Sequence, residues 1–170
     1  MRPTSDEHAP YYGKYVALVP DDDLDIVHHL ADQHHETVGS LRKAKQKGDF
    51  AYEPGKWTVK EVVGHICDTE RVMAYRALRF ARGDTTDLPG FEQDDYVATA
   101  NFNGRSMDDL VEEVWSVRAA TLSLAKQLGE EALNRRGKAN GNPATVRALL
   151  YIIAGHELHH MAILKERYGV

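Results

Sequence analysis

Two histidines near the carboxyl end of the chain, His156 and His160, have the spacing of metal ligands on a helix. They lie in an apolar-periodic run from about Thr145 to Tyr168. Because a helix advances about 100° per residue, the two side chains fall one turn apart in the middle of the buried stripe. Imidazoles left unpaired in an apolar core would each cost free energy. A metal ion is the commonest partner of two converging neutral imidazoles, so this pair predicts a metal site.

The alternative is that both residues are core histidines, each bonded to a backbone carbonyl or a carboxylate. That is the usual state of a single buried histidine, whereas His-x-x-x-His on one helical face matches the spacing of metal ligands. The neighbouring His159 lies at the edge of the stripe. For His159 we expect a half-exposed position or a hydrogen bond to a ligand, in preference to ligation.

The stretch from His156 to His160 also matches the His-Glu-x-x-His pattern of zinc proteases, in which the glutamate is a general base. The metzincin form requires a glycine and then another histidine downstream, where this chain has Ile163 and Glu166. Other zincins take their third ligand from well downstream, and ten residues follow His160. We therefore expect a third ligand to come from upstream. We expect Glu157 on the flank of the helix, at the surface or beside the ligands.

Two upstream histidines are candidates for the third ligand. His34 lies within the apolar stripe of the first expected helix, and it is more simply a core or boundary histidine. His65 lies beside the stripe of the second, turned about 100° from its centre. Periodicity alone leaves His65 either at the surface or reaching into the interior. Cys67, the only cysteine, is a conceivable nucleophile, but a helical cysteine near the core is more often an inert small hydrophobe.

Four amphipathic segments of about twenty or more residues are expected to be the helices that position these side chains. Thr58 and Glu61 form a capping box at the start of the second, and Asn142 with Pro143 reads as the start of the fourth. No strand pattern is convincing. Residues 1–20 hold three prolines and no periodicity, which predicts an extended arm with surface tyrosines. The expected helices cover about residues 21–47, 58–82, 106–128 and 143–168.

These segments predict an all-α protein of one domain, residues 1–170, built as a four-helix bundle. A chain of this length can bury a full core without disulfides or other staples. The connections around residues 84–105 and 130–141 are long enough to allow a crossover. A short helical turn is expected within the first of them, near residues 94–100.

The composition excludes several classes of function. Acidic residues exceed basic ones by 26 to 21, which argues against nucleic-acid binding. A single cysteine permits no intrachain disulfide and fits a reducing compartment. The sequence has no run of 18 apolar residues and no signal-peptide pattern, so we expect a cytoplasmic protein without membrane contact. It also has no P-loop, dinucleotide-binding fingerprint or nucleophile elbow.

Two stretches resemble the DinB-like superfamily, which is named for DNA-damage-inducible bacterial genes and is distinct from the polymerase of that name. Trp57–Arg71 resembles its second helix, and Gly155–His160 its fourth. The likeness extends to the loop Leu88–Phe91 and to the helix opening Thr145–Val146. It implies a four-helix bundle with one crossover connection, in a protein that is often dimeric, and we therefore expect a homodimer.

The resemblance also implies a divalent metal ion, zinc or nickel, held by three histidines. By motif position these correspond to His65, His156 and His160. The resemblance gives no support to His34 or His159 as ligands, and these two, with Glu157, remain candidates for roles beside the ligands.

Characterised relatives in this superfamily include thiol S-transferases that use low-molecular-weight thiols, and a thiol-dependent isomerase, while other members were labelled metal-dependent hydrolases. The expected function is therefore metal-dependent transfer of a low-molecular-weight thiol to small electrophiles. The alternatives are a hydrolase that uses a metal-activated water and a non-enzymatic, stress-related metal-binding module. No residue of this chain can be assigned to thiol recognition.

Overall fold

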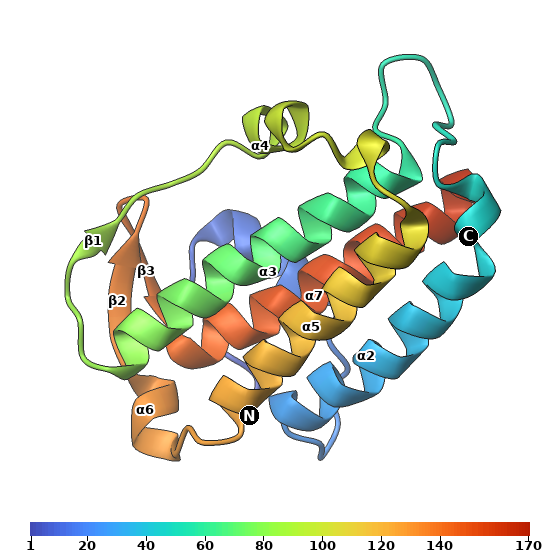
Figure 1. The fold of residues 1–170 in the computed structure, drawn as a ribbon. Coiled ribbons are helices and arrows are strands. Elements are labelled where there is room, and N and C mark those ends of the chain that lie inside the picture. Colours follow the sequence, from blue (N-terminus) through green and yellow to red (C-terminus); the bar gives the residue numbers. More distant parts are fainter.

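Four long helices lie side by side in the computed structural model, which describes all residues 1–170 (Figure 1). Both α2 and α3 pack against α5 and α7, so α2 and α3 occupy diagonal corners of the bundle. The expected all-α four-helix bundle is confirmed. The four helices are α2 (Ile26–Lys43), α3 (Val59–Ala81), α5 (Met107–Ala125) and α7 (Val146–Ile163).

Side-chain caps fix where these helices begin. The Thr58 hydroxyl accepts a hydrogen bond from the Glu61 amide, and the Glu61 carboxylate accepts one from the Thr58 amide at 2.7 Å, as the capping box predicts. The end of α3 is followed by Gly83, whose φ of 80° is natural only for glycine. Helix α2 begins later than expected, because Asp25 caps it by accepting from the amide of His28.

A small three-stranded sheet is present where the sequence gives no convincing strand pattern. Strands β2 (Arg136–Ala139) and β3 (Asn142–Thr145) form an antiparallel hairpin, and β1 (Asp87–Leu88) pairs in parallel with β2. The hairpin turns at Asn140 and Gly141, both with positive φ, and Asn-Gly is a strong hairpin signal. The prediction that Asn142 and Pro143 start the last helix is therefore wrong. Thr145 caps α7 by accepting from the amide of Ala148.

The first twenty residues do not form the expected extended arm. They contain the short helices η1 (Ser5–Glu7), η2 (Pro10–Tyr12) and α1 (Gly13–Val16), and α1 packs against α7. Val16 and Val19 are buried in the core. This close packing is possible because Gly155 on α7 has no side chain: a Cβ there would lie 1.9 Å from the Tyr15 carbonyl oxygen. Tertiary packing thus orders a segment that has no periodicity of its own.

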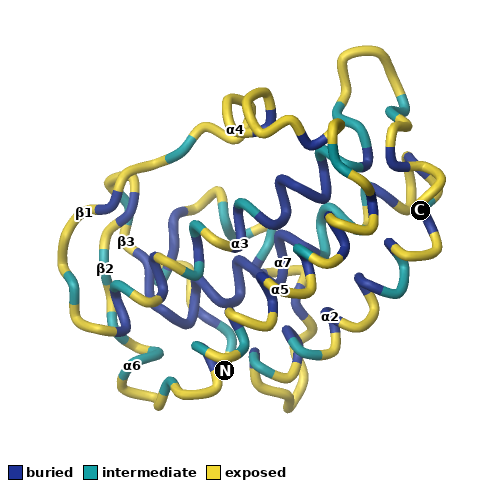
Figure 2. The backbone as a smooth tube through the Cα atoms, in the orientation of Figure 1, coloured by how far each residue is buried: buried dark blue, intermediate teal, exposed yellow.

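Helix α7 is the central helix of the molecule. Every residue from Val146 to Glu157 is buried, and Figure 2 shows this burial continuing along the inward faces of its neighbours. Two apolar clusters of 19 and 16 residues fill the interior at the two ends of the bundle. None of the helices has the combination of length and hydrophobicity that a membrane-spanning segment needs. The remaining elements are η3 (Lys45–Lys47), α4 (Gln93–Ala100), η4 (Phe102–Gly104), α6 (Glu130–Asn134) and η5 (Leu164–Tyr168).

Candidate metal centre

Three histidines from α3 and α7 converge inside the bundle. One ring nitrogen from each of His65, His156 and His160 lies within 4.8 Å of the others. The Nε2 atoms of His65 and His156 are 3.0 Å apart. Two imidazoles bound at about 2.0–2.1 Å to a tetrahedral zinc ion would have their nitrogens roughly 3.3 Å apart. The three residues therefore have the spacing and the donor chemistry of a metal site.

Burial keeps these three side chains neutral at physiological pH. Desolvation lowers the pKa of His65 to about 4 and that of His160 to about 3. It also holds the pKa of His156 well below its usual value, and the neighbouring histidines lower this pKa further. Neutral imidazole is the form that binds a metal ion, so the site needs no proton release to be ready for one.

Aromatic side chains lie against two of the three rings. The indole of Trp57 lies on His65 with ring centroids 5.0 Å apart, and the ring of Tyr15 contacts His156 edge-on at 5.4 Å. The hydroxyl of Thr69 lies 3.5 Å from Nδ1 of His65, where a hydrogen bond would orient the ring. The position before His65 is also a glycine: a Cβ on Gly64 would meet the Phe102 ring at 2.3 Å. The site is therefore closed on several sides by protein.

A cavity of about 380 Å³ opens onto two of the histidines, His65 and His156. Its wall comes from η2, α1, α3, the start of α4 with the residues before it, the β2–β3 turn and α7. The cavity has room for a small molecule beside these two rings. A second cavity of about 210 Å³, lined by Trp57 and Tyr52, opens onto His160.

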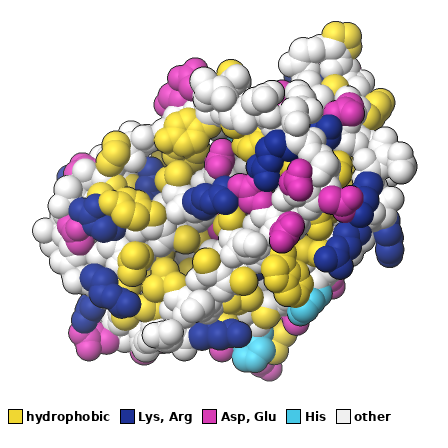
Figure 3. All heavy atoms as spheres, in the orientation of Figure 1, with side chains coloured by type: hydrophobic (Ala, Val, Ile, Leu, Met, Phe, Trp, Pro, Cys, Tyr) yellow, Lys and Arg dark blue, Asp and Glu magenta, His cyan; other side chains and the backbone are white.

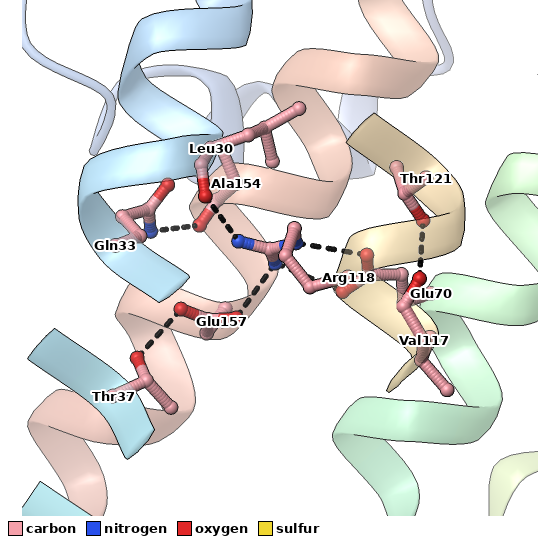
Figure 4. A network of polar contacts seen from close by, with 9 residues as sticks. All are labelled: Leu30, Gln33, Thr37, Glu70, Val117, Arg118, Thr121, Ala154 and Glu157. Atoms are coloured by element: carbon pink, nitrogen blue, oxygen red, sulfur yellow. Dashed lines mark hydrogen bonds and ion pairs between the residues drawn. The ribbon is translucent and has the colours of Figure 1, made fainter. Parts of the chain in front are cut away.

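Glu157 does not face the three histidines. It is 2% exposed, and its carboxylate accepts hydrogen bonds from Arg118 on α5 and from the hydroxyl of Thr37 on α2, both at 2.6 Å (Figure 4). Burial raises the pKa of Glu157, and the contacts with Arg118 and Thr37 oppose that shift. The expected flank position is wrong, because α7 is buried on all sides. A general base of the zinc-protease kind is not present at this position.

Arg118 is the centre of a buried polar network that the sequence pattern did not reveal. Its guanidinium is fully buried, donates to both carboxylate oxygens of Glu70 at 2.8 Å, and reaches Glu157 and the carbonyl of Leu30 (Figure 4). Although burial alone lowers the pKa of Arg118, the two carboxylates raise it overall. The sequence did contain a signal for this network, because Arg118 and Glu70 lie within the apolar stripes of α5 and α3. The network ties four helices together.

The other two candidate residues lie outside the cluster. His34 is buried against the ring of Trp115 at 4.1 Å, with its Nδ1 unpartnered, on the side of α2 that faces α5. His159 is half-buried, and its ring contacts Tyr15 at 5.4 Å. Cys67 is buried, and desolvation raises its pKa, so it is not a ready nucleophile.

Comparison with known proteins identifies the family. A model described as the DinB superfamily matches residues 11–164. A relative from Oceanobacillus iheyensis, named "Putative metal-dependent hydrolase OB0413", is 28% identical over 133 residues, which cover 76% of this chain and 74% of that protein.

Two solved structures from Bacillus subtilis share the fold. YfiT, described as "a probable metal-dependent hydrolase with an unusual four-helix bundle topology", aligns with a TM-score of 0.69 and 17% identity over 99% of this chain and 94% of that one. The DinB-like protein YjoA aligns with a TM-score of 0.59 and 24% identity over 82% of this chain and 85% of that one. With a family model matched over most of its length, this chain belongs to the DinB superfamily.

Proposed function

We propose that this protein binds a divalent metal ion, zinc or nickel, through His65, His156 and His160. The observation that carries the proposal is the convergence of three neutral imidazoles on one point beside a cavity. An ion held there would supply Lewis acidity and would lower the pKa of a bound water or thiol. Trp57 and Tyr15 limit water around the rings, and Thr69 holds the orientation of one of them.

Within this proposal, the reaction is transfer of a low-molecular-weight thiol to a small electrophile. The cluster of potential ligands contains no carboxylate, and Glu157 is engaged by Arg118 and Thr37. Hydrolysis of the zinc-protease kind uses a glutamate as general base. A thiol has a much lower pKa than water, so its thiolate forms without such a base.

Metal-dependent hydrolysis is the second candidate, and two observations favour it. The relative from Oceanobacillus and YfiT are both described as hydrolases. In addition, a carboxylate, that of Asp94 on α4, lines the same cavity as His65. A metal-binding module without enzymatic activity is the third candidate.

Metal analysis of single variants tests the site. We expect the purified protein to hold about one zinc or nickel ion, and alanine at position 65, 156 or 160 to abolish that occupancy. The matched controls are His34→Ala and His159→Ala, which remove an imidazole outside the cluster and should retain the ion. Full occupancy in the His65→Ala protein would show that the third ligand is wrongly assigned.

An activity assay separates the three candidates. The metal-loaded protein is incubated with cysteine, glutathione, bacillithiol or mycothiol, and with 1-chloro-2,4-dinitrobenzene as electrophile. We expect metal-dependent adduct formation that is absent from the His156→Ala protein. Turnover of ester or amide substrates without any thiol would favour hydrolysis, and no turnover in either assay would favour the binding module.

For assembly, we propose a homodimer formed through the outer face of α3 and α5, in a cytoplasmic protein without nucleic-acid partners. This face has a largely apolar groove of about 540 Å³, and hydrophobic side chains gather over it in Figure 3. Tyr75 and Leu78 on the groove are 50% and 38% exposed. Light scattering should give twice the chain mass, and Leu78→Glu should reduce it to that of a monomer. A monomeric wild-type protein would contradict this arrangement.

A further inference from the structure

Arg76 on α3 is a buried cation that has no carboxylate partner. It is 4% exposed, one guanidinium nitrogen donates to the carbonyl of Pro89 at 2.8 Å, and the other lies 3.6 Å from the sulfur of Met73. The ring of Phe91 lies 5.9 Å from its Cζ atom. All of these neighbours are uncharged. The charge of Arg76 is therefore left without a counterion inside the protein.

The other buried arginines show how this fold normally treats such a charge. Arg118 pairs with Glu70 and Glu157, and Arg147 pairs with Glu130 at 3.2 Å. Arginine is rarely buried unless it is paired, because desolvation of an isolated charge is costly. Arg76 alone among the three departs from this pattern. An anionic ligand could supply the negative partner that Arg76 lacks.

Arg76 lines the same cavity as two of the candidate metal ligands, His65 and His156. His65, Thr69, Met73 and Arg76 all face this cavity from α3. His65 and Arg76 are 11 residues apart, so they lie within about 20° of each other around the helix and roughly 16 Å apart along it. Helical side chains lean toward the amino end of their helix, and the contact with Met73 shows that the guanidinium does so. The guanidinium is therefore closer to His65 than the backbone separation indicates.

The rest of the cavity wall has charges of both signs. Lys14 lies over the ring of Tyr15 with its Nζ 4.8 Å from the centroid, and it forms no ion pair. Glu92 and Asp94 line the wall formed by α4 and the residue before it, also without ion pairs. A ligand with one anionic group near Arg76 suits this arrangement, whereas a second anionic group near Asp94 would be repelled.

We propose that Arg76 binds the carboxylate of a small monocarboxylic substrate or thiol co-substrate whose other end reaches His65 and His156. The proposal for Arg76 rests on the proposed function in one respect, which is the kind of group that the ligand presents to His65 and His156. The planar fork of arginine matches a carboxylate through two parallel hydrogen bonds, and this fixes the direction in which the molecule lies in the cavity. Lys14 adds positive potential at the cavity wall. The site thereby selects molecules with an acid group at one end.

The test compares an acid with its uncharged analogue. The cobalt(II)-loaded protein is titrated with 6-mercaptohexanoate and with 6-mercaptohexanol, and binding is followed by the thiolate-to-cobalt absorption band. We expect the acid to bind about 10- to 100-fold more tightly, the effect typical of a charge-assisted hydrogen bond. Arg76→Met should reduce the affinity for the acid to that for the alcohol and leave the alcohol unchanged. The matched control is Arg79→Met, on the same helix but outside the cavity, which should behave as wild type.

Each outcome decides one question. Equal affinity of the wild-type protein for acid and alcohol overturns the role of Arg76, and this comparison does not require the variant to fold. If neither thiol perturbs the cobalt spectrum, thiol binding at the metal fails instead. In that case, calorimetric titration of the metal-free protein with hexanoate and hexanol still tests Arg76. Binding of hexanoate alone supports the proposal, and binding of neither overturns it.

Discussion

The same substitution, glycine to alanine, is expected to have opposite effects at two helical positions. A Cβ at Gly155 on α7 would lie 1.9 Å from the carbonyl oxygen and 2.4 Å from the carbonyl carbon of Tyr15. These are backbone atoms, so no change of rotamer can relieve the clash. At Gly39 on α2 an added Cβ meets nothing within 4 Å. The comparison therefore isolates the contact between α1 and α7.

The magnitudes follow from two opposing effects. Alanine in a helix is favoured over glycine by roughly 0.5–1 kcal/mol, so Gly39→Ala should raise the free energy of unfolding by about that amount. Overpacking costs about 1–3 kcal/mol, and at Gly155 we expect the upper end because the whole of α1 must move. The net loss is about 2 kcal/mol. In a chain of this size, that corresponds to a decrease in Tm of about 4–8 °C.

Thermal and urea unfolding of the metal-free proteins, followed by circular dichroism, measures both effects. The metal is left out because an ion that binds only the folded state would add its own stabilisation. Because the ring of Tyr15 lies against His156, movement of α1 should also disturb the proposed metal site and weaken any metal binding there. A Gly155→Ala protein as stable as wild type would refute the packing of α1 on α7.

Other predictions concern the buried polar groups. The pKa values of His65 (about 4) and His160 (about 3) lie below the usual value, so the unfolded chain binds more protons. Urea titrations of the metal-free protein should therefore show stability falling from pH 6.5 toward pH 4, by about 1.4 kcal/mol per pH unit for each histidine; no decline would contradict their burial. Arg118→Met should lower the free energy of unfolding by about 3–5 kcal/mol, since it leaves buried carboxylates unpaired, and an unchanged urea midpoint would rule this out. Glu157→Gln should retain the full metal content in elemental analysis, whereas loss of the ion would place its carboxylate at the site. Cys67, whose pKa is raised by burial, should react with Ellman's reagent only after unfolding; rapid labelling of the native protein would disprove this.

Local signals in the sequence predict the helices well. The capping box at Thr58 and Glu61 sets the start of α3, and the i, i+4 spacing puts His156 and His160 on one face of α7. The contact between α3 and α7 that brings His65 to them is not local. Hydrophobic periodicity did not decide whether His65 lies at the surface or in the interior. Only the family resemblance suggested that it joins His156 and His160.

The errors have a common physical cause, which is burial that depends on distant segments. A helical-wheel projection assumes that a helix has one buried and one exposed face. Helix α7 is instead enclosed by α1, α2 and α3, so the projection wrongly predicted a flank position for Glu157. The arm before residue 20 acquires its structure from contact with Gly155, which no local pattern encodes. The Asn140–Gly141 turn was a readable hairpin signal, but the strands beside it are too short to show a periodic pattern.

The adjacent residues His156 and Glu157 together fix the rotation of α7 about its own axis. Turning the helix by about 100°, so that Glu157 takes the place of His156, would carry the carboxylate toward His65 and leave Arg118 facing Leu158. Helix α7 therefore has a single rotational setting, held from inside the bundle by the ion pair with Arg118. The nitrogens of the proposed site are already in position, so little ordering entropy would be lost on binding an ion. Selectivity among metal ions would then follow from a fixed spacing to which each ion must conform.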